Sequence, residues 1–177
     1  MIEVFKARRD EPCHEVAESL FLGSLENANN HQLLRELKIT AVISLLSRSQ
    51  AMSLAPFPVE ITSFMCHYVD DTESASIRHL FAMTTAFINT THARGGRVLA
   101  HCRAGISRSA TIVAAYLMHT IGGTPSFVRR LLRMHRAQVN PNPGFMRQLR
   151  WEWQRRTTWL AKKRQRAVRK NTKRWLQ

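Results

Sequence analysis

Residues 97–123 contain the pattern that most restricts how this chain folds: an apolar run, a polar loop and a second apolar run. The first run, Arg97-Val98-Leu99-Ala100, is short and unbroken after its arginine, which is typical of a fully buried strand. The second extends from Ala110 to Met118 and stops at Ile121-Gly122-Gly123, which is typical of a helix ended by glycine. The segment between them is therefore predicted to be a strand-to-helix turn, and it reads His101-Cys102-Arg103-Ala104-Gly105-Ile106-Ser107-Arg108-Ser109.

A turn of this kind binds anions, because the first turn of a helix has N–H groups without partners and carries the positive end of the helix dipole. Gly105 allows the loop to take a left-handed turn, in which successive amides point at one centre. The backbone amides predicted to hold a phosphate group are those of Arg103, Ala104, Gly105, Ile106, Ser107 and Arg108.

Cys102 lies at the mouth of this loop, where the N–H groups and Arg108 favour its thiolate and lower its pKa below the free value of about 8.5. The planar fork of Arg108 can hold two oxygens of a phosphoryl group. Ser109 is expected to donate a hydrogen bond to the thiolate, and His101 to bind the loop backbone from the strand side. These residues predict a nucleophilic cysteine opposite an anion-binding arginine.

The string His-Cys-x-x-Gly-x-Ser-Arg-Ser resembles the signature of the cysteine-dependent protein phosphatases, and Ser-Arg-Ser-Ala is most similar to their small, atypical dual-specificity branch. A lone cysteine is otherwise more often a small core residue. The resemblance covers about Val16 to Trp153. It implies one α/β domain with a central, mostly parallel, twisted sheet flanked by helices, and a catalyst that needs no metal or cofactor.

Two adjacent carboxylates, Asp70 and Asp71, follow a strand predicted over residues 61–69. A positioned acid that protonates a leaving oxygen typically contributes about 10²–10⁴-fold to a rate. In the family the general acid lies upstream of the cysteine, ahead of an aromatic residue in the next helix, and counting back from Phe81 selects Asp71. Asp-Asp-Thr is otherwise an ordinary capping or turn sequence, and Asp70 is the adjacent alternative.

The resemblance implies a two-step reaction on phosphotyrosine, phosphoserine and phosphothreonine in proteins, with Cys102 as nucleophile, Asp71 as acid and then base, and Arg108 holding the phosphocysteine. Three alternatives are an RNA 5′-phosphatase, a phosphoinositide phosphatase and a phosphoprotein-binding module with little turnover. RNA phosphatases typically carry Asn-Arg-Thr-Gly where this chain has Ser107-Arg108-Ser109-Ala110. Phosphoinositide phosphatases usually place lysines in the loop, where this chain has Ala104 and Ile106.

The cysteines Cys13, Cys66 and Cys102 are odd in number and have neither disulfide-framework nor zinc-site spacing. Residues 1–10 lack the apolar core of a signal peptide, and no run of about eighteen apolar residues occurs. We therefore expect an intracellular protein of the cytoplasm, the nucleus or both, without a metal site. A low-pKa cysteine is oxidisable, and whether Cys13 or Cys66 forms a disulfide with it stays open.

Periodicity predicts the elements around the loop. The expected elements are a strand within 15–24, an amphipathic helix over 27–37, a buried parallel strand over 41–46, a helix over 76–92 and a helix over 125–136. Thr124 caps the last of these. Its arginines Arg129, Arg130, Arg133 and Arg136 are expected to face outward.

Residues 139–149 include Pro141-Asn142-Pro143-Gly144-Phe145, which is similar to a family segment that begins the last helix of the domain. Asn142 is expected to cap that helix and Pro143 to be its first residue. The predicted divisions are an N-terminal segment over 1–14, a catalytic domain over 15–153 and a basic tail over 154–177.

Positive charge is concentrated in the tail. The chain has a net charge of +15, and residues 151–177 contain ten basic residues and one acidic residue. The simplest interpretation is a solvated tail, partly helical or disordered. Three functional interpretations compete with it: nuclear import, attachment to an anionic membrane, and nucleic-acid binding with stacking tryptophans. The expected partners are thus phosphoprotein substrates and, through residues 154–177, nucleic acid, a membrane surface or an import receptor.

Overall fold

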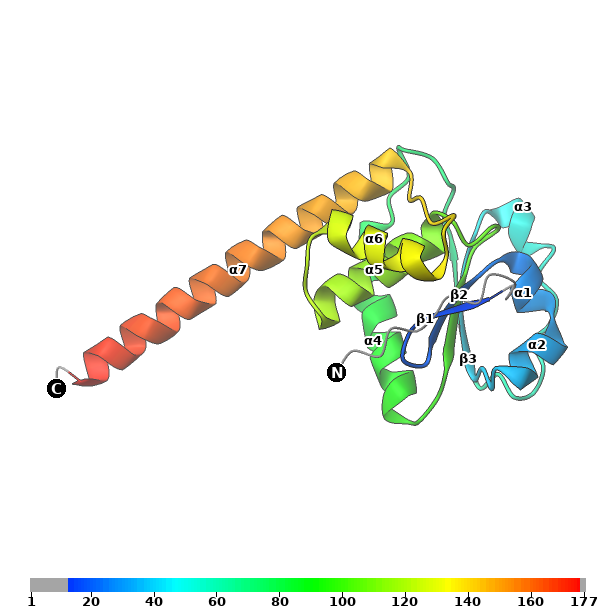
Figure 1. Cartoon of the computed structure of the whole chain (residues 1–177), viewed down its shortest axis with the longest axis horizontal. Coiled ribbons are helices and arrows are strands. Elements are labelled where there is room, and N and C mark those ends of the chain that lie inside the picture. Colours follow the sequence, from blue (N-terminus) through cyan, green and yellow to red (C-terminus); the bar gives the residue numbers. More distant parts are fainter. Residues whose placement is uncertain (1–12, 176–177) are drawn as a thin grey trace.

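A five-stranded sheet forms the centre of the molecule (Figure 1). The computed structural model describes residues 13–175, with side chains as far as Arg166. The strands are β1 (His14–Ala17), β2 (Leu20–Gly23), β3 (Ala41–Leu46), β4 (Ser63–Tyr68) and β5 (Val98–His101), in the order β1-β2-β5-β3-β4. Only the β1–β2 pair is antiparallel among these described strands. The predicted α/β class with a mostly parallel sheet is confirmed.

The central strands are buried on both faces, so their alternate side chains enter two separate cores. On one face, residues such as Ile43 and Ala100 join the larger core with residues from α4 to α7. On the other face, Val42 and Leu99 pack with Ala28 and neighbouring apolar residues in a smaller core. Burial on both sides explains why these strands are continuous apolar runs in the sequence.

Helices cover both faces of the sheet (Figure 1). The short helices α1 (Leu25–Asn29) and α2 (His31–Glu36) lie on the side of the smaller core, and α3 (Arg48–Ala51) follows β3. On the other side lie α4 (Phe81–Ala93), preceded by the 3₁₀ turn η1 (Arg78–Leu80), then α5 (Arg108–Thr120), α6 (Pro125–His135) and α7 (Pro143–Trp175). The central helix α5 is buried along almost its whole length.

Two expectations for the N-terminal part are wrong in detail. Residues 15–24 contain a hairpin, β1 and β2, because Ser19 adopts a positive φ of 56° and turns the chain. The helix expected over 27–37 is divided at Asn30, which ends α1 and caps α2 by accepting a hydrogen bond from the Leu33 N–H at 3.0 Å. Residues 1–12 of the predicted N-terminal segment lie outside the described part of the chain.

Helix α6 confirms the predicted cap but corrects one arginine. Thr124 Oγ1 accepts a hydrogen bond from the Phe127 N–H at 3.2 Å. Arg130 and Arg133 are exposed and Arg129 is partly exposed, whereas Arg136 is only 6% exposed. Arg136 has left the helix, with φ −136° and ψ 93°, so helical spacing no longer sets its direction.

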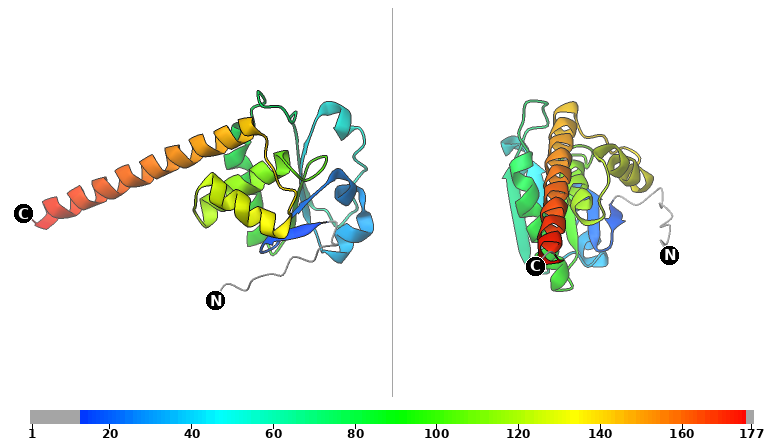
Figure 2. Two further views of the ribbon diagram at one scale, coloured as in Figure 1. Left: turned by 45° about the horizontal axis from the view of Figure 1, so that its top comes forward. Right: turned by 90° about the vertical axis from the view of Figure 1, so that its left-hand side faces the viewer.

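The boundary expected at residue 153 does not interrupt the backbone. Helix α7 is 33 residues long and includes both the last helix of the domain and residues 154–175 of the predicted tail. Its outer part projects from the body of the molecule (Figure 2). Among residues 13–175, no helix is both long and apolar enough to cross a bilayer. The side chain of Trp175 lies outside the described residues.

Candidate active site

The loop over residues 102–108, called here the 102–108 loop, connects β5 to α5, as the sequence predicts. Its carbonyl groups are bonded to donors that lie outside the loop. The pairs are Leu25 N to Arg103 O (3.1 Å), Arg136 Nη2 to Ala104 O (3.0 Å), Arg136 Nε to Gly105 O (3.1 Å), Asn140 N to Ile106 O (2.9 Å) and Thr111 N to Ser107 O (2.9 Å). Since C=O and N–H point in opposite directions in a trans peptide, holding the carbonyls outward turns the amides inward. The backbone thereby forms a cradle of N–H donors.

Gly105 makes the tight turn of this loop. Its φ is +68°, and a Cβ at this position would come within 2.7 Å of the Gly23 carbonyl carbon. Its N–H donates a hydrogen bond to Cys102 Sγ at 3.2 Å. Glycine is therefore required here both by conformation and by space.

Cys102 is buried, with 1% of its surface exposed, yet its environment favours the thiolate. Burial raises the pKa of the Cys102 thiol, but the hydrogen bonds from the Ser109 hydroxyl and amide, the charge of Arg108 and the Ile106 amide outweigh it, so that the pKa is lowered. The Ser109 Oγ lies 3.2 Å from Sγ. The structure thus places Ser109 where the sequence predicts it.

Arg108 is also buried, and its guanidinium contacts two structural acceptors while one of its donors makes no hydrogen bond to a described residue. Nη1 donates to Gln50 Oε1 at 2.8 Å and to the Val69 carbonyl at 3.0 Å. Nε is buried without a hydrogen-bond partner among the described residues and lies 3.8 Å from Asp71 Oδ2. A buried donor left unsatisfied is costly, and a bound phosphoryl oxygen would satisfy it.

Asp71 lies beside the loop, whereas Asp70 does not. Its Oδ1 accepts hydrogen bonds from Ser107 Oγ at 2.6 Å and Asn142 Nδ2 at 2.8 Å. Asp70 is exposed, and its carboxylate makes no hydrogen bond or ion pair with any described residue. The geometry supports the choice of Asp71 between the two neighbours.

Asn142 joins the acid, the loop and the last helix. Its Oδ1 accepts from the Phe145 N–H at 2.9 Å, which confirms the predicted cap of α7. The backbone N–H of Asn142 donates to Ser107 Oγ at 3.1 Å, while its side-chain amide donates to Asp71. Through these bonds the start of α7 fixes the position of the Asp71 carboxylate above the loop.

His101 supports the loop from beneath, at the end of β5. It is fully buried, with Nε2 2.5 Å from Ser44 Oγ and Nδ1 3.4 Å from the Cys102 carbonyl oxygen. Burial and the charge of Arg108 lower its pKa to about 4, against the opposing effect of the hydrogen bond with Cys102. The imidazole is therefore neutral at pH 7.

Two residues that position the site were missed by the sequence interpretation. Arg136 holds two carbonyls of the loop, and its Nη1 lies 3.0 Å from His14 Nδ1. Gln50 orients the Arg108 guanidinium and also accepts from the Ser47 N–H at 3.1 Å as part of a capping box. The Ser-x-x-Gln spacing of residues 47–50 is a signal for the cap, but no sequence pattern indicates that Gln50 also contacts Arg108.

Cys66 lies outside this site. Cys66 aligns with Ser44, and Ser44 aligns with His101, so Cys66 is two strands and about 10 Å from the end of β5. A disulfide needs Cα atoms closer than about 7 Å, so Cys66 does not reach Cys102 without backbone movement. Among the described residues, no group of three or more His, Cys, Asp and Glu side chains is placed to hold a metal ion.

Comparison with known proteins identifies the family. The family model "Dual specificity phosphatase, catalytic domain" matches residues 20–156. The chain is 39% identical over 136 residues to dual specificity protein phosphatase 1B of Arabidopsis thaliana, covering 76% of this chain and 78% of that protein. It is 37% identical over 139 residues to a probable rhodanese domain-containing dual specificity protein phosphatase of Dictyostelium discoideum, covering 78% of this chain and 28% of that longer protein.

Comparison with solved structures supports the same family. The crystal structure of the human tyrosine phosphatase-like serine/threonine/tyrosine-interacting protein superposes with a TM-score of 0.76 and 31% identity, covering 84% of this chain and 97% of that one. The match over residues 20–156 includes β2 to β5, the 102–108 loop and the start of α7. The chain belongs to the dual specificity phosphatase family of protein phosphatases.

Proposed function

We propose that this chain hydrolyses phosphotyrosine, phosphoserine and phosphothreonine in proteins through a phosphocysteine intermediate. The Cys102 thiolate attacks phosphorus, the bond from phosphorus to the leaving oxygen breaks, and Asp71 gives its proton to that oxygen. Water then attacks the phosphocysteine, Asp71 takes a proton from the water, and the thiolate leaves with phosphate as the product. No redox change occurs in either step.

The observation that carries this proposal is the set of donors around one sulfur. The Gly105 N–H and the Ser109 hydroxyl each lie 3.2 Å from Cys102 Sγ, and the buried Arg108 Nε makes no hydrogen bond to any described residue. A sulfur placed among preorganised donors is a nucleophile at neutral pH, and the same donors stabilise the charge of the transferring phosphoryl group. The family to which the chain belongs supports a protein as the substrate.

The other site residues have positioning roles in this proposal. Ser109 stabilises the thiolate as it leaves, and His101 holds the first carbonyl of the loop. Asn142 and Ser107 orient Asp71, while Gln50 orients Arg108. Each role rests on a hydrogen bond to a reacting side chain or to the loop backbone.

The test is turnover by the full chain and by Cys102→Ser, with phosphotyrosine and phosphothreonine peptides as substrates. The expected loss of kcat is at least about 10⁴-fold, since removal of a nucleophile abolishes the covalent route. Cys66→Ser is the matched control, because Cys66 lies two strands away, and it should keep its rate. An unchanged rate in Cys102→Ser would overturn the phosphocysteine route.

A panel of substrates separates the competing interpretations. Phosphopeptides, a 5′-triphosphorylated RNA and a phosphoinositide should be compared at equal concentration. The proposal expects the phosphopeptides to be hydrolysed fastest. Rapid RNA or phosphoinositide hydrolysis with inert phosphopeptides would contradict it, and tight phosphopeptide binding without turnover by the unmodified chain would indicate a binding module.

A further inference from the structure

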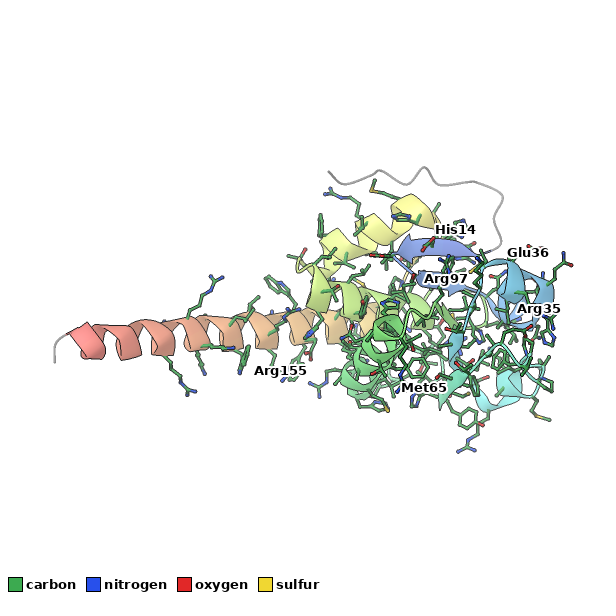
Figure 3. All side chains as sticks on the ribbon, turned by 90° about the horizontal axis from the view of Figure 1, so that it is seen from below. His14, Arg35, Glu36, Met65, Arg97 and Arg155 are labelled. Carbon is green, nitrogen blue, oxygen red and sulfur yellow. The ribbon has the colours of Figure 1, made fainter. Side chains whose placement is uncertain are left out.

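Helix α7 changes character at Arg156. Before it, Phe145 and Leu149 are fully buried against the domain. The Arg156 guanidinium donates to the carbonyl oxygens of Met118 and His119 at the end of α5. Beyond it, every residue from Thr157 to Arg166 is exposed, and Figure 3 shows their side chains standing clear of the domain. The segment 157–166 is called here outer α7.

Outer α7 lacks the buried apolar face that stabilises most helices in proteins, because each of its residues is exposed. It contains no acidic residue to pair with its cations, and Lys162 and Arg166 are like charges at the i,i+4 spacing, which is destabilising. A bound anion would remove this repulsion.

Three cations of α7 share one face of the helix. Arg155, Lys162 and Arg166 are seven and four residues apart, and Trp159 lies between the first two, four residues after Arg155. Spacings of three and four residues place side chains on the same side of a helix. The sequence continues this spacing with Arg169 and Lys173. The result is a basic stripe along the projecting helix, with a tryptophan inside it.

Aromatic rings and cations alternate along this stripe. Trp151 and Trp159 are 46% and 57% exposed, and they border a shallow hollow of about 420 Å³ together with Gln154, Arg155, Thr158 and Lys162. Arg78 lies 3.6 Å from the centroid of the Trp151 ring, and Lys163 lies 5.1 Å from that of Trp159. Exposed rings flanked by cations are suited to stacking on flat bases beside phosphates.

We propose that this face of α7, from Trp151 to Arg166, binds single-stranded nucleic acid. The cations would contact backbone phosphates, and Trp159 would stack on a base. An anionic membrane fits less well, since a membrane-bound helix needs an apolar face opposite its charges. Opposite the stripe, outer α7 offers Thr157, Leu160, Ala161 and Arg164, in which Leu160 is the one large apolar side chain.

The test measures binding of the full chain to a fluorescein-labelled, mixed-sequence single-stranded RNA, and to DNA of the same sequence, by fluorescence anisotropy at several salt concentrations. Replacement of Lys162, Lys163 and Arg166 by glutamine should weaken binding roughly tenfold or more and reduce the slope of log K against log salt by about 2. Trp159→Ala should weaken binding roughly tenfold and leave that slope unchanged, because stacking releases no counterions.

The matched control removes three charges from α6, with Arg129, Arg130 and Arg133 changed to glutamine. These arginines line a separate surface hollow, and the control should bind like the unmodified chain. The rate of hydrolysis of a small aryl phosphate should be the same in every variant. A failure of nucleic-acid binding can therefore be distinguished from a failure of the proposed phosphatase activity. Equal losses in the α6 and α7 variants would overturn the proposal. Binding to phosphatidylserine vesicles in preference to RNA and DNA would also overturn it and assign the helix to a membrane.

Discussion

The 102–108 loop and outer α7 both present positive groups to an anion, but they are held in different ways. In the loop, five successive carbonyls, from Arg103 to Ser107, are bonded to groups outside it, and Cys102 and Arg108 are buried. In outer α7, every residue is exposed. The loop is organised before its ligand arrives, whereas outer α7 gains its counter-charges only from a partner. The first arrangement suits catalysis, and the second suits reversible binding to an extended anion.

Among the variants that test this difference between the loop and outer α7, the largest effect on rate is expected at Asp71, the proposed acid beside the loop. Asp71→Asn should lower kcat about 10²–10⁴-fold, because the leaving oxygen loses its proton donor. Asp70→Asn, the adjacent control, should change the rate little, since its carboxylate is exposed and makes no hydrogen bond or ion pair with a described residue. Steady-state kinetics with a phosphopeptide measures both. A larger loss in Asp70→Asn would show that the other carboxylate is the acid.

A second pair of variants tests how tightly the loop is packed. Gly105→Ala should destabilise the protein by about 3 kcal/mol, because it combines a positive φ with a collision against the Gly23 carbonyl. Gly95 has a similar φ of +72°, but a Cβ added there would have no atom within 4 Å, so Gly95→Ala should cost about 1 kcal/mol. Denaturant unfolding compares the two, and equal costs would mean that the loop is not close-packed.

The pH dependence of the free energy of unfolding is a second difference between the site around the 102–108 loop and outer α7. The pKa of His101 is about 4 in the folded state, below its ordinary 6.5, so the unfolded chain binds more protons in this range. The contribution of His101 to the free energy of unfolding is therefore fully present above about pH 6.5. It falls by up to about 3 kcal/mol as the pH decreases toward 4.

Urea unfolding at a series of pH values measures this loss. His101→Gln should flatten the dependence whatever its absolute stability, while His79→Gln, at an exposed site, should keep it. Outer α7 contains no histidine and no acidic residue. An unchanged dependence in His101→Gln would contradict the assignment of this loss to His101, whereas a smaller remainder is expected from His67, whose pKa burial also lowers.

The smallest effect is expected in outer α7. Leu160→Ala should change the free energy of unfolding by less than about 0.5 kcal/mol, because Leu160 is 39% exposed and belongs to neither core. Leu149→Ala, in the buried first part of the same helix, should cost about 2–5 kcal/mol. Thermal or urea unfolding compares them, and a large cost at Leu160 would mean that outer α7 is packed.

Local patterns predicted the core of the site well. The strand, loop and helix around Cys102, the buried strand β3, the Thr124 cap and the Asn142 cap all follow from short runs of sequence, and all are present. They were predictable because apolar runs, glycine stops and capping residues act within a few neighbouring residues. The catalytic roles assigned to the loop residues and to Asp71 stay predictions until turnover is measured.

Contacts between distant segments could not be predicted in the same way. Arg136 was expected on the outer face of α6, but the chain leaves the helix at that residue and the guanidinium returns to the loop. Gln50 contacts Arg108 across 58 positions of sequence, and no periodicity encodes such a meeting. The tail was expected to be partly helical or disordered, and α7 continues through residues 154–175, although this part has no apolar periodicity to signal a helix.

The account depends on an ionised Cys102 in the unliganded protein, and titration of that thiol tests it most directly. The rate of alkylation by iodoacetamide, followed at Cys102 against pH, should give an apparent pKa well below the free value of about 8.5. Ser109→Ala should raise that pKa, since it removes the hydroxyl 3.2 Å from the sulfur. A Cys102 pKa at or above about 8.5 in the unmodified protein would contradict the account.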